Sequence, residues 1–254
     1  MNSYFRNLRK IEFTITNACT GRCKHCSEAE HLHAFPGEHI DADAAVAALR
    51  EAAARYPIKT VMTFGGEALL YPQTVYRIHS AARDLDIPQR QVITNGFFSK
   101  DPSDIAEVAG LLHSCGVNDV LVSVDAFHQE TIPLDIVKRF ALAAQKSGIL
   151  VRLSPAWLVC PEDDNPYNRM TKSILSSFDG TGIGVGDGNI VFAQGNARKY
   201  LSEYLKSENG KNPYAEDPFD IRCLSFSANG DVLDGNIYKS SITEIMCGYA
   251  PQLQ

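Results

Sequence analysis

Short apolar runs rich in β-branched residues alternate along the chain with longer segments whose apolar positions recur at the helical period. Each run is bounded by polar, glycine or proline residues, which is typical of a short buried strand. The segments between them are typical of amphipathic helices, several of which begin near a proline or end at a glycine. We expect strands at residues 11–16, 60–64, 91–94, 119–124, 150–154 and 189–193, and helices at residues 41–55, 74–85, 103–114, 134–147, 167–178 and 197–206.

This repeated strand–helix order predicts an α/β fold with a parallel sheet covered by helices. Six such units are visible, and a closed barrel of eight would leave little room for the chain after residue 207. We therefore expect a partial (β/α)6 TIM-like barrel over residues 1–206 and a small C-terminal appendage over residues 207–254. Within the appendage, a turn at residues 228–231 lies between runs that can pair as a hairpin.

Composition narrows the function classes. The formal net charge of −6 argues against a nonspecific nucleic-acid partner, which needs a basic face. The sequence contains no apolar run of about 18 residues, so we expect no membrane span. The first ten residues lack the apolar stretch of a secretory signal, which makes the cytoplasm the expected location.

Seven cysteines are present, and three of them, Cys19, Cys23 and Cys26, fall within eight residues. An odd count with such grouping does not indicate a disulfide framework and favours metal binding or chemistry. The three directly follow the first strand, and active sites of parallel α/β folds gather at the carboxyl ends of strands. Three thiolates can hold three irons of a cubane and leave the fourth iron open. The alternative is a zinc-stabilised binding module in which His25, His31 or His33 supplies a fourth ligand.

The spacing Cys-x3-Cys-x2-Cys after the first strand resembles the defining motif of radical S-adenosylmethionine (SAM) enzymes. A second match, Gly65-Gly66-Glu67 after the second strand, resembles the segment that binds the methionine amino group of SAM in that family. The glycines let the backbone approach a ligand, and a carboxylate can pair with an ammonium group.

Further matches follow at later strand ends. Asn95 lies in a Thr-Asn-Gly segment like that of the family, and Ser123 and Asp125 end the fourth strand, where the family often contacts the ribose or carboxylate of SAM. Arg152 lies on the fifth strand, where a basic residue often pairs with the SAM carboxylate. The resemblance thus implies SAM contacts at Gly65, Gly66, Glu67, Asn95, Ser123, Asp125 and Arg152.

The resemblance also implies a mechanism. A [4Fe-4S] cluster held by the three cysteines would chelate SAM, and an electron donor such as flavodoxin or ferredoxin would reduce the cluster so that SAM is cleaved. The 5′-deoxyadenosyl radical would then remove hydrogen from a small-molecule or peptide substrate. His128, which follows the fourth strand, is the expected acid–base group.

The tail bears on the reaction subclass. Its segment from Cys223 to residue 233 resembles the opening hairpin of the SPASM or twitch domain, which carries an added cluster in part of the family. The second cysteine of that pattern is missing near Asp234, so we expect a degenerate domain without a cluster. A redox-neutral reaction follows: epimerisation, rearrangement or addition, with Cys223 or Cys160 as hydrogen donor. The alternative is a two-cluster dehydrogenase or peptide-crosslinking maturase.

Overall fold

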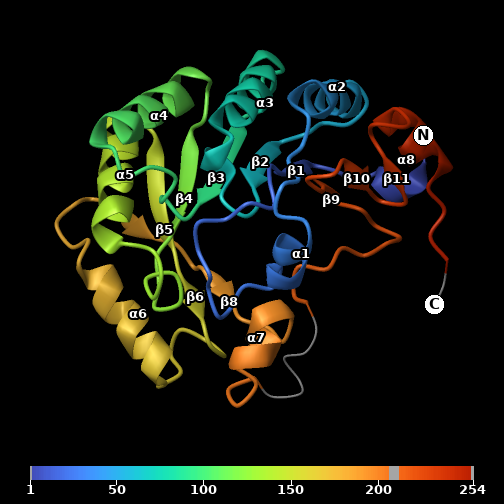
Figure 1. The fold of residues 1–254 in the computed structure, drawn as a ribbon. Coiled ribbons are helices and arrows are strands. Elements are labelled where there is room, and N and C mark those ends of the chain that lie inside the picture. Colours follow the sequence, from blue (N-terminus) through green and yellow to red (C-terminus); the bar gives the residue numbers. More distant parts are fainter. Residues whose placement is uncertain (1, 206–211, 253–254) are drawn as a thin grey trace.

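In the computed structural model, which describes residues 2–205 and 212–252, seven strands form one wholly parallel sheet in the order β7-β5-β4-β3-β2-β1-β9. Figure 1 shows helices α2 to α5 in an arc along one face of this sheet. The strands are β1 Lys10–Thr14, β2 Thr60–Phe64, β3 Gln89–Thr94, β4 Asp119–Ser123, β5 Leu150–Ser154, β7 Gly184–Val185 and β9 Cys223–Phe226. The long helices are α2 Ala42–Ala53, α3 Pro72–Asp84, α4 Pro102–Ser114, α5 Leu134–Lys146 and α6 Pro166–Ser176.

Local signals explain where these helices begin. Asp41 accepts a hydrogen bond from the Ala44 amide and Asp101 accepts one from the Ser103 amide, so each caps a helix. Proline occupies the first turn of α3, α4 and α6, where its missing N–H costs no helical hydrogen bond.

The two faces of the sheet differ. Side chains such as Val61, Val120 and Leu153 are fully buried in one core with residues of α2 to α5. The alternating positions point the other way, onto what we call the inner face, and most of them are half-buried. This face carries Lys10, Glu12, Gln91, Asp119, Ser123, Arg152 and Cys223. The inner face therefore mixes these polar side chains with apolar ones such as Met62 and Leu121.

The structure confirms the partial α/β barrel and five of the six expected strands. The sixth is present only in part: residues 189–190 form β8 Asn189–Ile190, which pairs with β6 Ala156–Trp157 outside the main sheet. The sheet is continued instead by the two-residue strand β7. Its glycine-rich surroundings, which include Gly182, Gly186 and Gly188, carry no apolar run that marks a strand.

The tail joins the fold more closely than an appendage would. Strand β9 pairs in parallel with β1 and extends the sheet, while α8 Ile242–Gly248 packs beside α2. The expected turn near residue 229 is present, but the hairpin is formed by β10 Asp231–Val232 and β11 Gly235–Asn236. The expected boundary between residues 206 and 207 lies outside the described residues.

Smaller elements complete the chain: the 3-10 helices η1 Ser3–Phe5 and η2 Ala68–Leu70, and the helices α1 Ala29–Ala34 and α7 Gly195–Tyr200. In the part of the chain that is described, no helix is both long and apolar enough to cross a bilayer.

Candidate functional site

The three cysteines lie on the segment that leaves the carboxyl end of β1, residues 15–28, which we call the cysteine loop. Its backbone is tied to the end of β2. The Thr16 carbonyl accepts the Gly66 amide at 2.8 Å, and the Ala18 carbonyl accepts the Glu67 amide at 2.7 Å. The Gly-Gly-Glu segment therefore holds the entrance of the cysteine loop in place.

The far end of the same loop is fixed by the start of α7. The Asn196 amide donates to the Cys26 carbonyl at 3.0 Å, and the Asn196 side chain donates to the Cys23 carbonyl at 3.1 Å. Sequence reasoning missed this role of Asn196. In the sequence, the neighbouring Gly195 is a signal for it. The structure shows why a glycine stands there: a Cβ on Gly195 would lie 2.3 Å from the Ser27 backbone oxygen.

The three thiols have different surroundings. Cys23 is buried, Cys26 is half-buried and Cys19 is exposed. Burial raises the pKa of the Cys23 and Cys26 thiols. Thiolates at these positions need a cation beside them, and iron–sulfur clusters are held by thiolates. The donor set, three thiols on one loop at the carboxyl end of a barrel strand, fits a [4Fe-4S] cluster with one open iron.

Gly65 and Gly66 are required by the close approach of the two loops. Gly65 has φ of 142°, and a Cβ at Gly66 would lie 2.1 Å from the Ala18 backbone oxygen. A side chain of any size there would push the cysteine loop away from β2.

We therefore expect Gly66→Ala to lower the free energy of unfolding by about 3 kcal/mol, because the new methyl group meets backbone that cannot move aside cheaply. Urea unfolding measures this. The matched control is Gly110→Ala in α4, where a Cβ meets no atom within 4 Å and the change should stabilise by about 0.5–1 kcal/mol. Equal effects of the two changes would contradict the proposed contact.

The structure gives the Glu67 side chain a different partner from the expected ammonium group. The residue is fully buried, and its carboxylate accepts hydrogen bonds from the Leu69 amide, the Thr94 hydroxyl and the Asn95 amide at 2.7–2.9 Å. Burial raises the pKa of this carboxyl group, and the three hydrogen bonds oppose that rise. Glu67 thus joins the end of β2 to the end of β3, and the Gly65-Gly66 backbone is left to face a ligand.

Asn95 lies where the motif predicts, beside the cysteine loop. Its side-chain nitrogen donates to the Thr20 hydroxyl at 3.1 Å and lies 3.7 Å from the Cys19 sulfur. Gly96 follows with φ of 73°, a left-handed turn that suits glycine. Asn95 is therefore placed to contact whatever the three cysteines hold.

Asp125, expected to contact SAM, is instead fully buried and organises its own loop. It accepts hydrogen bonds from the amides of Phe127, His128 and Ala156 and from Nδ1 of His128, the last at 2.7 Å. Burial alone would raise the pKa of Asp125, but attraction to His128 and the hydrogen bonds outweigh it and lower the pKa to about 2. The carboxylate fixes the ring of His128, and its contact with SAM stays a prediction.

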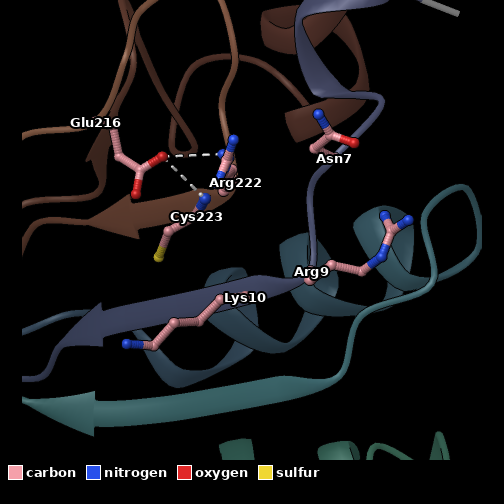
Figure 2. A pocket seen from close by; sticks show the side chains of 6 residues that line it. All are labelled: Asn7, Arg9, Lys10, Glu216, Arg222 and Cys223. Carbon is pink, nitrogen blue, oxygen red and sulfur yellow. Dashed lines mark hydrogen bonds between the residues drawn. The ribbon is translucent and has the colours of Figure 1, made fainter.

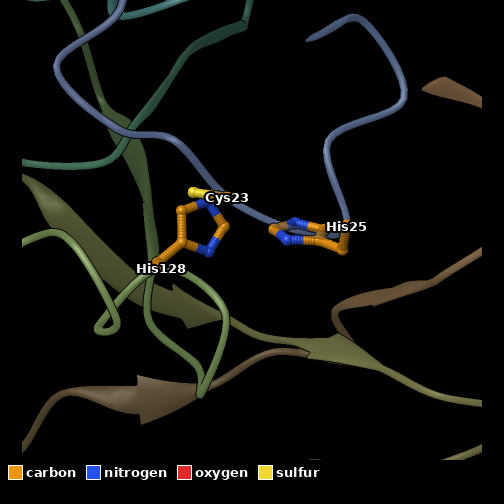
Figure 3. A group of neighbouring side chains, drawn as sticks. All are labelled: Cys23, His25 and His128. Atoms are coloured by element: carbon orange, nitrogen blue, oxygen red, sulfur yellow. The ribbon is translucent and has the colours of Figure 1, made fainter. Parts of the chain in front are cut away.

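His128 itself is half-buried and lies against the cysteine loop. Figure 3 shows its ring next to the Cys23 sulfur and facing His25. The two imidazole rings are 4.7 Å apart in an edge-to-face arrangement. Burial lowers the pKa of His25 to about 4, so this ring is neutral at physiological pH.

Ser123 ends β4 and lies opposite Ser154 at the end of β5, on the inner face beside the cysteine-loop end of the sheet. The structure does not bring Arg152 to that end. Its guanidinium pairs with Asp119, the first residue of β4, with Nε 3.2 Å from the carboxylate. Asp119 lies four residues, roughly 13 Å, from Ser123 along the strand. In this arrangement Arg152 serves Asp119, and its contact with the SAM carboxylate stays a prediction.

We expect Arg152→Met to lower the free energy of unfolding by about 1–3 kcal/mol, because it leaves the buried Asp119 carboxylate without its cation. SAM affinity should stay within about twofold of wild type, as distant sites act independently. Anaerobic equilibrium dialysis with SAM and urea unfolding test the two statements. Arg139→Met, on the exposed surface of α5, is the control; a large loss of SAM affinity confined to Arg152→Met would restore the direct contact.

The two candidate hydrogen donors lie in different places. Cys223 begins β9 on the inner face and pairs with Lys10 at the amino end of β1, away from the cysteine loop. It lines a pocket of about 550 Å³ with Asn7, Arg9, Lys10, Glu216 and Arg222, drawn in Figure 2. Cys160 follows Leu158, which shares a buried apolar cluster with Cys23 at the opposite end of the barrel.

Comparison with known proteins identifies the family of this chain. The family model described as Radical SAM superfamily matches residues 13–151, more than half of the chain. A GTP 3',8-cyclase of Mycobacterium marinum is 31% identical over 126 residues, which are 49% of this chain and 33% of that protein. A GTP 3',8-cyclase of Desulforamulus reducens is 26% identical over 131 residues, 52% of this chain and 38% of that protein.

The chain therefore spans about a third of the length of the curated relatives it matches. Among solved structures, histidine-tagged anSMEcpe with bound AdoMet superposes with a TM-score of 0.57 at 12% identity, covering 94% of this chain and 77% of that one. This likeness shows a shared fold. With the family match over the cysteine loop and the strands that follow it, the chain belongs to the radical SAM superfamily.

Proposed function

We propose that this chain uses a single [4Fe-4S] cluster on Cys19, Cys23 and Cys26 to cleave SAM, and that its reaction on a polar small molecule or peptide is redox-neutral. The reaction would be an epimerisation, a rearrangement or an addition. The observation that carries the single-cluster part is the separation of the two tail cysteines onto opposite faces of the sheet.

That separation follows from strand geometry. Cys223 points to the inner face, whereas its neighbour Leu224 is buried in the helix-side core together with Ile242 and Ile245 of α8. Cys247 lies on α8, whose Thr243 donates to Glu51 of α2. Cys223 therefore faces away from the core against which α8 packs, which supports the proposal that it shares no added cluster with Cys247.

Membership of the superfamily makes the chain an enzyme that uses a [4Fe-4S] cluster and SAM, and it displaces the zinc-stabilised binding module as an account of the whole chain. When bound, these groups supply the 5′-deoxyadenosyl radical that removes hydrogen from a substrate. Such enzymes need a reductant, for which we propose flavodoxin or ferredoxin in the cytoplasm.

The chain's own residues divide the remaining work. The Gly65-Gly66 backbone and Asn95 border the cysteine loop and would orient SAM. Ser123 would contact SAM from the neighbouring strand end. His128, held by Asp125, can accept or donate a proton at the nitrogen that Asp125 leaves free.

The polar side chains of the inner face support a polar substrate. Lys10 pairs with Glu12, Ser225 donates to Glu12 at 3.1 Å, and Arg152 pairs with Asp119. Charged groups on a half-buried surface favour ligands that can hydrogen-bond over purely apolar ones.

A thiol hydrogen donor completes the redox-neutral proposal. Burial, with the nearby Glu12 carboxylate, raises the pKa of Cys223 to about 12, so it stays protonated at neutral pH. Hydrogen-atom transfer needs this S–H form. Cys160 lies near the cysteine-loop end, where the radical would form, whereas Cys223 lies at the opposite end of the barrel, so Cys160 is the better placed of the two candidates.

The relatives' name suggests a second substrate class, GTP. The shared region covers about half of this chain, and most of each relative lies outside it. GTP is therefore a compound to test, alongside sugars, aminocyclitols and short peptides.

Counting iron and sulfide on anaerobically purified chain tests the single-cluster proposal. We expect about four irons and four sulfides per chain, because Cys19, Cys23 and Cys26 lie within eight residues of sequence and one loop can present them to one cluster. About eight irons would overturn the proposal and revive the two-cluster dehydrogenase or peptide-crosslinking maturase. One zinc without iron in the active enzyme would contradict cluster chemistry altogether.

A further inference from the structure

Three side chains with metal-binding atoms converge beside the cysteine loop: Cys23, His25 and His128. One ligand atom from each lies within 4.8 Å of the other two, and Figure 3 shows the three side chains as neighbours. They come from two different segments, since His128 follows β4 and the others lie on the loop after β1. Cys19 and Cys26 are not members of this group.

His128 has the hydrogen bond that orients a metal-binding imidazole. Its Nδ1 lies 2.7 Å from the Asp125 carboxylate, which leaves Nε2 as the nitrogen available to a cation. Histidine ligands in metal sites usually donate their other ring N–H to a carboxylate in this way. Three backbone amides hold Asp125, so the ring is supported by fixed structure.

His25 contributes a buried ring nitrogen, Nδ1, that lacks a hydrogen-bond partner among residues 2–205 and 212–252. Its ring lies against Phe127, with ring centres 4.9 Å apart, so a packed side chain restricts its rotation. A buried polar atom without a partner is uncommon and calls for an explanation such as an ion.

We propose that the cluster-free chain binds one divalent cation of the zinc class at Cys23, His25 and His128, with water as fourth ligand. Tetrahedral zinc sets neighbouring ligand atoms about 3.5 Å apart. Displacements of the ligand atoms by about 1 Å would therefore close the site. Binding forms one Zn–S and two Zn–N bonds, displaces water from the ion and releases the Cys23 thiol proton. No electron is transferred.

The charges favour such an ion. Zn²⁺ with one thiolate leaves a single positive charge, and the buried Asp125 carboxylate beside His128 balances it. Two neutral imidazoles and one thiolate suit zinc better than magnesium or calcium, which prefer oxygen ligands.

The site and the cluster exclude each other, because both need the Cys23 sulfur. Zinc bound here would block cluster assembly, so the chain would exist in either a zinc form or a cluster form. This inference concerns the cluster-free chain, and its outcome is independent of the reaction proposed above.

Titration of the metal-free chain with Co²⁺ under anaerobic conditions tests the site, because Co²⁺ is a spectroscopic substitute for zinc. We expect one equivalent to bind, with the visible bands of four-coordinate cobalt and a thiolate-to-cobalt charge-transfer band. His128→Gln and His25→Phe should each weaken binding by at least about 100-fold, beyond the usual effect of an outer-sphere partner. Zn²⁺ should displace the cobalt.

The matched control is Cys19→Ala, which removes a cluster ligand outside the proposed site. It should keep the cobalt spectrum and lose the cluster, whereas the two histidine variants should lose the cobalt spectrum and keep about four irons after reconstitution. Far-ultraviolet circular dichroism checks that each variant folds. If Cys19→Ala abolishes cobalt binding, or if the histidine variants leave it unchanged, the three motif cysteines hold the ion and the proposal fails.

Discussion

Replacing Cys26 with alanine should leave the purified chain without its brown colour and without SAM cleavage. With one of three thiolates removed, the loop offers only two iron ligands, and the reaction chemistry resides in the cofactor rather than in protein side chains. We expect iron to fall from about four per chain to below about one after anaerobic reconstitution. Formation of 5′-deoxyadenosine with dithionite as reductant should fall to the level of an enzyme-free control.

Cys247→Ala is the matched control for that result. Cys247 is exposed on α8, on the helix side of the sheet, so its loss should change neither iron content nor SAM cleavage. The Cys26 variant should still fold, since its side chain is only half-buried and the loop keeps its backbone bonds to Gly66 and Asn196. Full iron in the Cys26 variant would assign the cluster to other cysteines.

Features with a local signal were predictable from the sequence. β2 and β5 have the expected bounds, because each is an apolar run closed by polar or glycine residues. The cysteine loop could be placed for the same reason, since its spacing follows a recognisable strand directly. The family match now supports the cofactors that this spacing implied.

Side-chain partners were not predictable in the same way. Arg152 and Ser154 share one strand and one face, yet Arg152 pairs with Asp119 toward the amino end and Ser154 lies at the carboxyl end. Asp125 and Glu67 follow strand ends as ligand-binding residues do, but both turn inward to backbone amides. A carboxylate near a site serves either the ligand or the backbone, and only tertiary structure decides which.

Strand β9 shows a second limit. Its sequence suggested one arm of a hairpin, because a turn follows at residue 229. In the fold, β9 instead pairs in parallel with the edge of β1 that β2 leaves free. This pairing buries Leu224 and Phe226 in the helix-side core. The burial of two apolar side chains outweighs the local preference for a hairpin. The same pairing directs Cys223 to the inner face.

Among the variants considered, replacement of the buried Glu67 has the largest expected effect on the free energy of unfolding. Glu67→Ala removes an acceptor from the Leu69 amide, the Thr94 hydroxyl and the Asn95 amide at once, in a fully buried place. Each unsatisfied buried donor costs about 1–3 kcal/mol, and partial relaxation brings the expected total to about 4 kcal/mol. Urea unfolding of the cluster-free chain measures this loss without interference from the cofactor.

Two further variants separate the roles of this carboxylate. Thr94→Val removes one of the three donors and also the acceptor of the Gly96 amide, so we expect about 2 kcal/mol from the two lost hydrogen bonds. Glu67→Gln keeps an acceptor oxygen and should lie between Thr94→Val and Glu67→Ala in stability. If Glu67 acts only by joining β2 to β3, SAM affinity should decline in the same order as stability across the three variants. A Glu67→Gln chain of nearly wild-type stability that no longer binds SAM would instead show that the carboxylate meets the SAM ammonium group directly.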